Sequence, residues 1–401
     1  MAKKPAKSAP KRARSEDSAP AAARRVVAPV DFSKIIGQNR ALEILAASIR
    51  SAHVHHAWIF YGPAGVGKFT TALSFASLLL DPETTVPAKG WPVAKPGSEV
   101  QRLLASGSHP DLGIVTKELA RFSDDEQVRD RKLITIPKEV IDEYLVRPSK
   151  LAPLMKGGGG GGVGGASKVF IVDEAELMDR SPTNAPTQNS ILKTLEEPPP
   201  GTVIILVTTN PDRLLPTIRS RSQQVSFAPL SEGDMKRWLQ DSKEEIENVT
   251  GKPVGPEDSR FLLEFAAGSP GEVVRAHAGN LVEWSRTLEP MLAECDAGKY
   301  VVGLGPAMAK LVETWASEEA AKDKQASKDA ANRAGAMLLL KLLSQRAQRK
   351  LRLGLNKPGR ALGAIDAIRE AQRQIEANVA MQFVTEWLST RLSGKEEAVL
   401  V

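Results

Sequence analysis

The spacing of hydrophobic residues changes from helical to strand-like early in the chain. Between Asn39 and Ser51, apolar residues recur every three or four positions, which predicts an amphipathic helix. Ala57 to Tyr61 is a continuous apolar run and predicts a short buried strand. A glycine-rich turn follows it, and an apolar helix is expected from Thr70 to Leu80. Strand, loop and helix in this order are typical of a nucleotide-binding unit.

Two later apolar runs, Val169 to Val172 and Val203 to Val207, predict further buried strands, with a helix around Asn189 to Leu195 between them. Strands that alternate with helices indicate an α/β fold with a parallel sheet. A helix is also expected at Lys138 to Val146. After Pro229 the strand patterns end and helical patterns continue to the end of the chain.

These patterns predict a P-loop α/β domain at 31–229, a small helical lid domain at 230–288 and a larger helical domain at 289–401. Apolar clusters at helical spacing characterise the last of these: Met337, Leu338, Leu339, Leu342, Leu343, Ile365, Ile368 and Ile375. The glycines at 157–165 formally match GxGxxG, but they precede a strand and open no helix. We therefore expect a flexible linker there.

The net charge of +6 is concentrated at the start of the chain. Residues 1–26 carry eight Lys or Arg and two acidic residues, so the other 375 residues sum to zero. A segment rich in Ala, Pro, Ser and Lys buries too little apolar surface to fold, so residues 1–30 are expected to be a disordered basic tail. It could act as a solubilising tail or attract DNA phosphates in a salt-sensitive way.

Composition limits the class of protein. A chain of 401 residues with 42% hydrophobic residues can form two or three globular domains. No run approaches the ~18 apolar residues that cross a bilayer, and no apolar stretch follows the basic start, so we expect a cytoplasmic protein. Cys295 is the single cysteine, which excludes an intrachain disulfide and a cysteine-based zinc cluster.

The glycine-rich turn between strand and helix has the residue types of a phosphate loop. Its candidate nucleotide-binding residues are Gly62, Pro63, Gly65, Val66, Gly67 and Lys68. Glycines let the backbone amides surround phosphates, and a lysine can reach the terminal ones. Phe69 stands where a Ser or Thr hydroxyl would hold Mg²⁺, and Thr70 follows one residue too late, about 100° further around the helix. The sequence thus favours nucleotide binding without implying efficient hydrolysis.

Candidate acids and a candidate amide follow the two later strands. Asp173 and Glu174 end the strand at Val169 to Val172, where Asp173 would organise Mg²⁺ and Glu174 would polarise the attacking water of a competent site. Asn210 follows the next strand and could orient a water near a γ-phosphate. An Asn before a proline is equally typical of a turn.

Several ordered motifs resemble the AAA+ clamp-loader family of DNA polymerase III. Besides the phosphate loop, they are His56–Trp58, Ser108–Asp111, Asp173–Glu176, Leu192–Pro199 and Leu215–Arg221. The resemblance covers roughly Asp31 to Pro229 and extends weakly to Ile365–Val379. It implies a ring of five subunits that uses ATP to place a sliding clamp on primed DNA, with motor and delta-like subunits as partners and the C-terminal domain as a collar.

The resemblance also implies a role for Arg221. In the family this arginine reaches the ATP of the neighbouring subunit, so Arg221 would act in trans, and Ser222 replaces the cysteine that usually follows. Two other departures join Phe69 in favouring a non-motor subunit. Gly271 stands about where motor subunits have a nucleotide-sensing arginine, and the four zinc cysteines of the family are missing. No zinc is expected, and His109 is expected to be structural.

We therefore expect a clamp-loader subunit with weak or no ATPase of its own. ATP or ADP is the expected ligand, and Mg²⁺ only together with nucleotide. An autonomous ATPase motor of the same fold and a DNA-binding adaptor that acts through the basic tail are the alternatives. The motor alternative predicts ATP turnover by the isolated chain. The adaptor alternative predicts that deletion of residues 1–26 abolishes function.

Overall fold

The computed structural model describes residues 28–51, 53–131, 133–155, 165–179, 185–321, 328–354 and 358–393. The basic segment up to residue 27 and the glycine run at 157–164 lie outside the described residues. The chain divides into two compact units. The first contains the residues up to Pro63 together with Gly67–Ala228, and the second contains Ala64–Val66 together with the chain from Pro229 onward.

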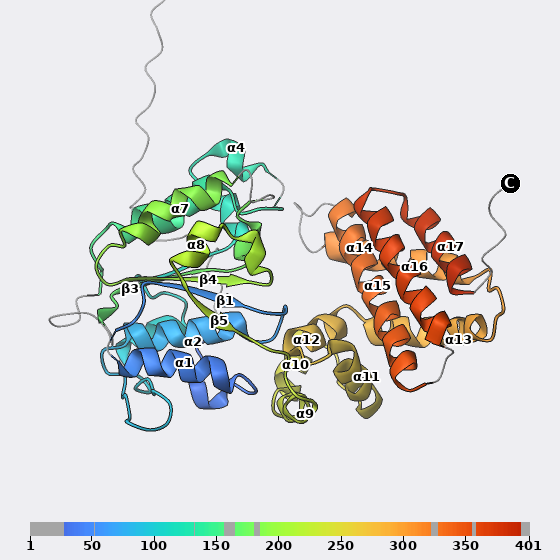
Figure 1. Ribbon diagram of the computed structural model, residues 1–401, viewed down its shortest axis with the longest axis horizontal. Helices are drawn as coiled ribbons and strands as arrows, with labels where there is room; N and C mark the ends of the chain where they lie inside the picture. Colours follow the sequence, from blue (N-terminus) through green and yellow to red (C-terminus); the bar gives the residue numbers. More distant parts are fainter. Residues whose placement is uncertain are drawn as a thin grey trace, which may run out of the picture. The chain divides into compact units, whose positions relative to one another are not determined.

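A five-stranded parallel sheet forms the centre of the first unit (Figure 1). Its spatial order is β2-β3-β4-β1-β5. The strands are β1 (Ala57–Tyr61), β2 (Leu112–Val115), β3 (Lys168–Val172), β4 (Thr202–Thr208) and β5 (Gln223–Ser226). The three central strands are those that the apolar runs predict, so the predicted α/β fold with a parallel sheet is confirmed. The two edge strands were not predicted.

Helices cover both faces of this sheet (Figure 1). They are α1 (Asn39–Arg50), α2 (Lys68–Leu80), α3 (Glu99–Ala105), α4 (Glu126–Arg129), α5 (Lys138–Ile141), α6 (Arg147–Ser149), α7 (Pro186–Glu196) and α8 (Pro216–Ser220). Short 3₁₀ helices complete the unit: η2 (Phe32–Lys34), η3 (Lys117–Phe122), η6 (Ala175–Leu177) and η7 (Pro211–Arg213). The π-helix η4 (Asp142–Val146) continues α5, so a helix covers the predicted range Lys138 to Val146. On one face, Trp58 and Phe60 of β1 pack against Phe75 of α2 with ring centroids 5.4 and 6.4 Å from it.

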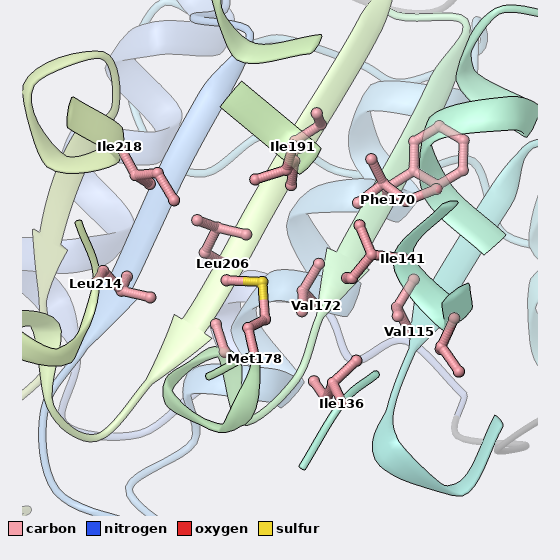
Figure 2. Close-up of a cluster of buried hydrophobic side chains, with 14 of the residues drawn as sticks. Val115, Ile136, Ile141, Phe170, Val172, Met178, Ile191, Leu206, Leu214 and Ile218 are labelled. Atoms are coloured by element: carbon pink, nitrogen blue, oxygen red, sulfur yellow. The ribbon is translucent and has the colours of Figure 1, made fainter. Parts of the chain in front are cut away.

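The other face of the sheet carries a continuous apolar core (Figure 2). Phe170 and Val172 of β3 alternate with residues that face α2, as the two-residue period of a strand requires. Ile141 of α5, Ile191 of α7 and Ile218 of α8 belong to the same cluster. The core therefore fixes the carboxyl ends of β1, β3 and β4 relative to one another, which is where the candidate chemistry lies.

The second unit is helical throughout its described residues. It contains α9 (Glu232–Asp241), α10 (Lys243–Thr250), α11 (Pro256–Ala266), α12 (Pro270–Ala278), α13 (Leu281–Asp296), α14 (Leu304–Ala321), α15 (Lys328–Arg352), α16 (Pro358–Glu376) and α17 (Met381–Leu392). Among α14–α17, α15 packs against α14 and α16, and α17 packs against the same two helices. None of the helices described in either unit is long and apolar enough to span a membrane.

The segment between α2 and β2, where the family would place zinc cysteines, is organised by a buried carboxylate. Asp81 is fully buried and accepts hydrogen bonds from Ser98 Oγ at 2.7 Å, Glu83 N at 3.0 Å and Gln101 Nε2 at 3.1 Å. An isolated bridge pairs Thr85 with Val93 in the same segment. Within the described ranges, no three His, Cys, Asp or Glu residues gather as metal ligands would. Hydrogen bonds to one acid thus organise this segment.

Replacing Asp81 with Asn tests this role. An amide keeps the shape but turns one acceptor into a donor that faces donors, so we expect the free energy of unfolding to fall by about 1–2 kcal/mol. Urea unfolding of the full chain measures the loss. Glu83→Gln is the matched control, because Glu83 pairs with Lys95 on the surface, and it should cost less than about 0.5 kcal/mol. Equal effects of the two variants would contradict the assigned role.

His109 is buried beside the same segment. Its Nδ1 accepts a hydrogen bond from Asp111 N at 3.2 Å, while Nε2 is buried without a hydrogen-bond partner among the described residues. Burial lowers the pKa of His109, against the opposing charges of Asp111 and Asp81. His109 is thus held neutral inside the unit, in keeping with a structural residue.

This lowered pKa predicts a loss of stability in acid. The unfolded chain takes up the proton near pH 6.5 and the folded chain only at lower pH, so stability falls as the pH drops below about 6.5. The His109→Asn variant keeps an acceptor and should lose less stability between pH 7.5 and 5.5, by up to about 1 kcal/mol. Thermal unfolding at pH 7.5 and 5.5 measures this difference in stability loss. His53→Asn is the control, because His53 is exposed. An unchanged pH profile would disprove the assignment.

Candidate nucleotide-binding site

The phosphate loop has the backbone that its glycines predict. Gly62 has φ 142°, and a Cβ there would lie 2.2 Å from the carbonyl oxygen of Phe227, so no side chain fits. Gly67 has φ 98° and immediately precedes α2, which begins at Lys68. The loop therefore turns from the end of β1 into a helix N-terminus, the arrangement that presents backbone amides to phosphate groups.

Lys68 lies inside the loop rather than in solvent. It is 6% exposed, and its Nζ donates to the carbonyl oxygens of Gly62 at 2.7 Å and Pro63 at 2.5 Å. Burial lowers the pKa of Lys68, while the charges of Glu176 and Asp173 act in the opposite direction. The lysine is positioned to exchange loop carbonyls for phosphate oxygens.

The first turn of α2 offers no evident hydroxyl ligand for a metal ion. Phe69 occupies the position of the usual Ser or Thr. Thr70 is half-buried on the helix one position later, and the hydroxyl of Thr71 donates to the carbonyl of Gly67 at 2.9 Å. The helix is regular from Lys68, so no distortion carries Thr70 to the metal position.

The register of the sheet brings the candidate acids to the same edge as the loop. Tyr61 lies opposite Thr208, and Val172 lies opposite Leu206. Asp173 follows β3 directly, and its backbone N donates to Val115 O of β2. Asp173 thus has the position of a metal-organising acid at the carboxyl end of the sheet.

Glu174 forms an ion pair with a neighbouring lysine of the same unit. Its backbone has φ 51° and ψ 46°, a left-handed conformation that is unusual for a residue with a side chain. Its Oε2 lies 2.7 Å from Nζ of Lys117, at the start of η3. This ion pair competes with any role of Glu174 in polarising a water. The sequence had not indicated Lys117.

A third acid, Glu176, is more deeply buried than Glu174. It is 8% exposed, and its Oε1 accepts hydrogen bonds from N and Oγ1 of Thr209 at 3.1 and 2.5 Å. Its Oε2 is buried and has no hydrogen-bond partner among the described residues. Sequence reasoning missed this residue as part of the site, although the three acids in Asp173–Glu176 were a signal of it.

Asn210 has the turn role that was the alternative interpretation. Its Oδ1 accepts a hydrogen bond from the backbone N of Asp212 at 3.0 Å and so caps η7. A side chain that caps a turn must give up this hydrogen bond before it can orient a water. Thr209, held by Glu176, is the polar residue of this strand end that lies beside the acids.

Arg221 lies at the end of the short helix α8 and remains half-exposed. Its Nη2 is 3.0 Å from Oε1 of Glu196 at the end of α7, and its Nη1 donates to Thr217 O at 3.1 Å. The side chain is 38% exposed. Ser222, in place of the family's cysteine, donates its hydroxyl to Ile218 O. A surface ion pair of this kind is weak, so Arg221 can exchange Glu196 for another anion.

The middle of the phosphate loop, Ala64–Val66, groups with the second unit. Ser269 Oγ donates to Ala64 O at 2.8 Å, and Gly271 N donates to Gly65 O at 2.9 Å. A Cβ on Gly271 would lie 2.7 Å from the Cα of Gly65, so a side chain at this position has no room. Arg275, one turn later, pairs with Glu272 at 2.7 Å.

Comparison with known proteins identifies the first unit. Residues 37–231 match the family model described as DNA polymerase III, delta subunit. The delta' subunit of DNA polymerase III from Pseudomonas aeruginosa is 30% identical over 236 residues, which are 58% of this chain and 59% of that protein. This region belongs to the DNA polymerase III clamp-loader family. Its five-stranded parallel sheet, with a glycine-rich loop after β1, fits the α/β fold that the resemblance implies.

Other members of this clamp-loader family are similarly related. The gamma subunit of Buchnera aphidicola is 28% identical over 60% of this chain and 56% of that protein. The gamma/tau subunit of Mycobacterium tuberculosis is 28% identical over 61% of this chain and 36% of its own length. This chain thus spans less than two thirds of these relatives. Among solved structures, Thermotoga maritima RuvB aligns over 90% of this chain and 88% of its own, with 11% identity and a TM-score of 0.38.

The clamp-loader phosphate loop fits a polyphosphate better than it fits a metal ion. Glycine amides, Lys68 and a helix N-terminus can hold phosphate groups. Asp173 remains as a metal-organising acid and Glu176 Oε2 is an unpaired oxygen, but the hydroxyl ligand is missing at Phe69. The residues therefore lack the usual protein ligand set for Mg²⁺ beside a nucleotide.

Proposed function

We propose that this chain is a delta prime-like clamp-loader subunit of the DNA polymerase III holoenzyme, which helps load the sliding clamp onto primed DNA. It has weak or no ATPase activity of its own and supplies Arg221 in trans to the site of a neighbouring motor subunit. Its proposed partners are the motor tau/gamma-like and delta-like subunits, the clamp and primed DNA. Its proposed place is the cytoplasm.

One observation carries this proposal: Phe69 removes the metal hydroxyl from a loop that otherwise keeps its phosphate-binding form. Two further contacts support it. Glu174 is paired with Lys117, and Gly271 leaves no room for a sensing side chain. The metal hydroxyl and the room for a sensing side chain are thus missing within the chain, whereas Arg221 is half-exposed.

ATP hydrolysis by the full chain tests the proposal directly. We expect negligible turnover by the chain alone and strong turnover when it is mixed with motor subunits, clamp and primed DNA. The comparison requires the same mixture without this chain. Turnover of the mixture that does not depend on the chain would refute the assignment.

The second candidate is a motor subunit of the tau/gamma type, because gamma relatives match the chain about as well as delta' does. It predicts vigorous turnover by the isolated chain that disappears in Lys68→Ala. The basic-tail adaptor predicts instead that removal of residues 1–26 abolishes loading. Under our proposal, that truncation only weakens DNA affinity at low salt.

A further inference from the structure

The second unit contains a groove of about 1200 Å³ that the proposed function does not use. Residues of α9, α11, α13 and α15 line it. Helix α11 contacts both α13 and α15. In addition, the buried carboxylate of Glu272 on α12 lies 2.6 Å from Nζ of Lys341 on α15. These contacts tie the two sides of the groove together within one unit.

The inner part of the groove is apolar. It is lined by Leu230, Met235, Phe261, Phe265, Leu288 and Leu342. Phe261 stacks on Phe265 with ring centroids 5.9 Å apart, and the ammonium of Lys341 lies 5.0 Å from the Phe265 ring centre. At the end of α15, Leu353 is 58% exposed. A concave apolar surface with an exposed leucine at its edge suits the apolar face of a helix.

The rim of the groove is cationic. Six basic side chains line it against three carboxylates: Lys236, Arg260, Arg346, Arg349, Lys350 and Arg352 against Glu232, Glu264 and Glu289. Asp296, outside the lining, pairs with both Arg346 and Lys350, so the surplus is two positive charges. Arg260 and Arg349 share the single carboxylate of Glu264. Arg352 is exposed and forms no ion pair with the described residues. Because residues 27–401 sum to zero charge, this surplus is a local concentration.

We infer that this groove binds an amphipathic helix with acidic flanks from a partner protein. The apolar face of that helix would cover Phe261 and Leu353, and its carboxylates would pair with Arg349 and Arg352. Charge complementarity of this kind raises the association rate and selects the partner. Residues 1–26 of this chain carry the same sign of charge as the rim, which excludes them as the occupant.

A nucleic acid is the less suitable occupant. DNA binding depends mainly on contacts between cations and phosphates along an open surface, and base stacking needs an accessible aromatic ring. Here Phe265 is 2% exposed and cannot take a base, and one face of the partly exposed Phe261 ring is already stacked on Phe265. The partly exposed Phe261 and the exposed Leu353 instead suit contact with the apolar side chains of a polypeptide.

The test uses the full-length chain and a fluorescein-labelled synthetic helical peptide of about 18 residues, with leucines on one face and glutamates on the flanks. We expect micromolar binding in fluorescence anisotropy, weakened by salt. The Arg349→Glu/Arg352→Glu variant should lose at least tenfold in affinity, and Arg352→Gln alone should lose two- to fourfold. Arg369→Glu/Arg373→Glu is the matched control, because these arginines are more than 70% exposed on α16 and do not line the groove.

Three outcomes would overturn the inference. One is equal binding of a scrambled peptide of the same composition, which would indicate nonspecific charge attraction. Another is an equal loss in the α16 control. The third is displacement of the peptide by single-stranded DNA with a groove-dependent affinity higher than that of the peptide, which would identify nucleic acid as the occupant. Unchanged thermal unfolding of Arg352→Gln would show that a lost affinity does not reflect a lost fold.

Discussion

In a reconstituted clamp loader, Arg221→Ala should lower ATP turnover at one neighbouring site by about 10³-fold, the effect expected when a trans-acting arginine finger is removed. In the proposed role, the guanidinium would stabilise negative charge that develops on the transferred phosphoryl group, and alanine would supply no such charge. The chain itself should remain folded, because Arg221 pairs with Glu196 where both side chains are substantially exposed. Such a pair contributes at most about 1 kcal/mol to stability. Single-turnover hydrolysis by the assembled complex measures the effect.

Two variants of the same region sharpen the result. Arg219→Ala removes a cation two residues away that pairs with Asp212 at 2.6 Å, and it should leave turnover unchanged. Glu196→Gln removes the local partner of Arg221, so turnover should be unchanged or higher. Equal turnover of Arg221→Ala and the unsubstituted complex would exclude Arg221 from the mechanism.

The substitution Phe69→Ser should raise the affinity of the isolated chain for ATP in the presence of Mg²⁺ by roughly ten- to a hundredfold, the range seen when metal-site interactions are changed. Serine restores a hydroxyl at the first turn of α2, where it can coordinate the metal beside Asp173. Without Mg²⁺ the same variant should bind ATP no better than the unsubstituted chain. Calorimetric titration with and without a chelator measures both values.

Phe69→Ala distinguishes the effect of the added hydroxyl from the effect of removing the aromatic ring. It removes the same aromatic surface without offering a ligand, so it should show no gain that depends on Mg²⁺. Adding Lys68→Ala to Phe69→Ser should abolish binding, since Lys68 is the cation of the loop. If serine and alanine at position 69 behaved alike, Phe69 would not be what limits metal binding.

The sequence predicted the central strands of the sheet well, because strands buried on both faces need continuous apolar residues. Edge strands do not need such a run, so the sequence did not predict them. In β5 only Val225 of the four residues is buried, so its pattern resembles a loop. In β2, Gly113 interrupts the apolar run because a Cβ there would lie 2.5 Å from the ring of Phe170. Both strands are stabilised by pairing with a neighbouring strand that is distant in sequence, and a local pattern of residues does not contain this information.

The same distinction applies to the candidate site. The strand, loop and helix order around Lys68 and the place of Asp173 after a strand were predictable, because both follow from local patterns along the chain. The contacts of Glu174 with Lys117 and of Arg221 with Glu196 join residues 57 and 25 positions apart. Sheet register and helix packing create such pairs, so neither could be obtained from spacing alone. The cap at Asn210 was one of two local interpretations, and its neighbour Asp212 decided between them.

The central position of β1 has a consequence for the order of folding during synthesis. Both neighbours of β1 come much later in the chain, since Ala57 lies opposite Ile204 and Trp58 opposite Gln223. A ribosome that adds 5–20 residues per second needs roughly seven to thirty seconds to reach β4 after completing β1. During that interval the Ala-Trp-Ile-Phe-Tyr strand has no strand to pair with, which gives a nascent-chain chaperone a defined apolar target.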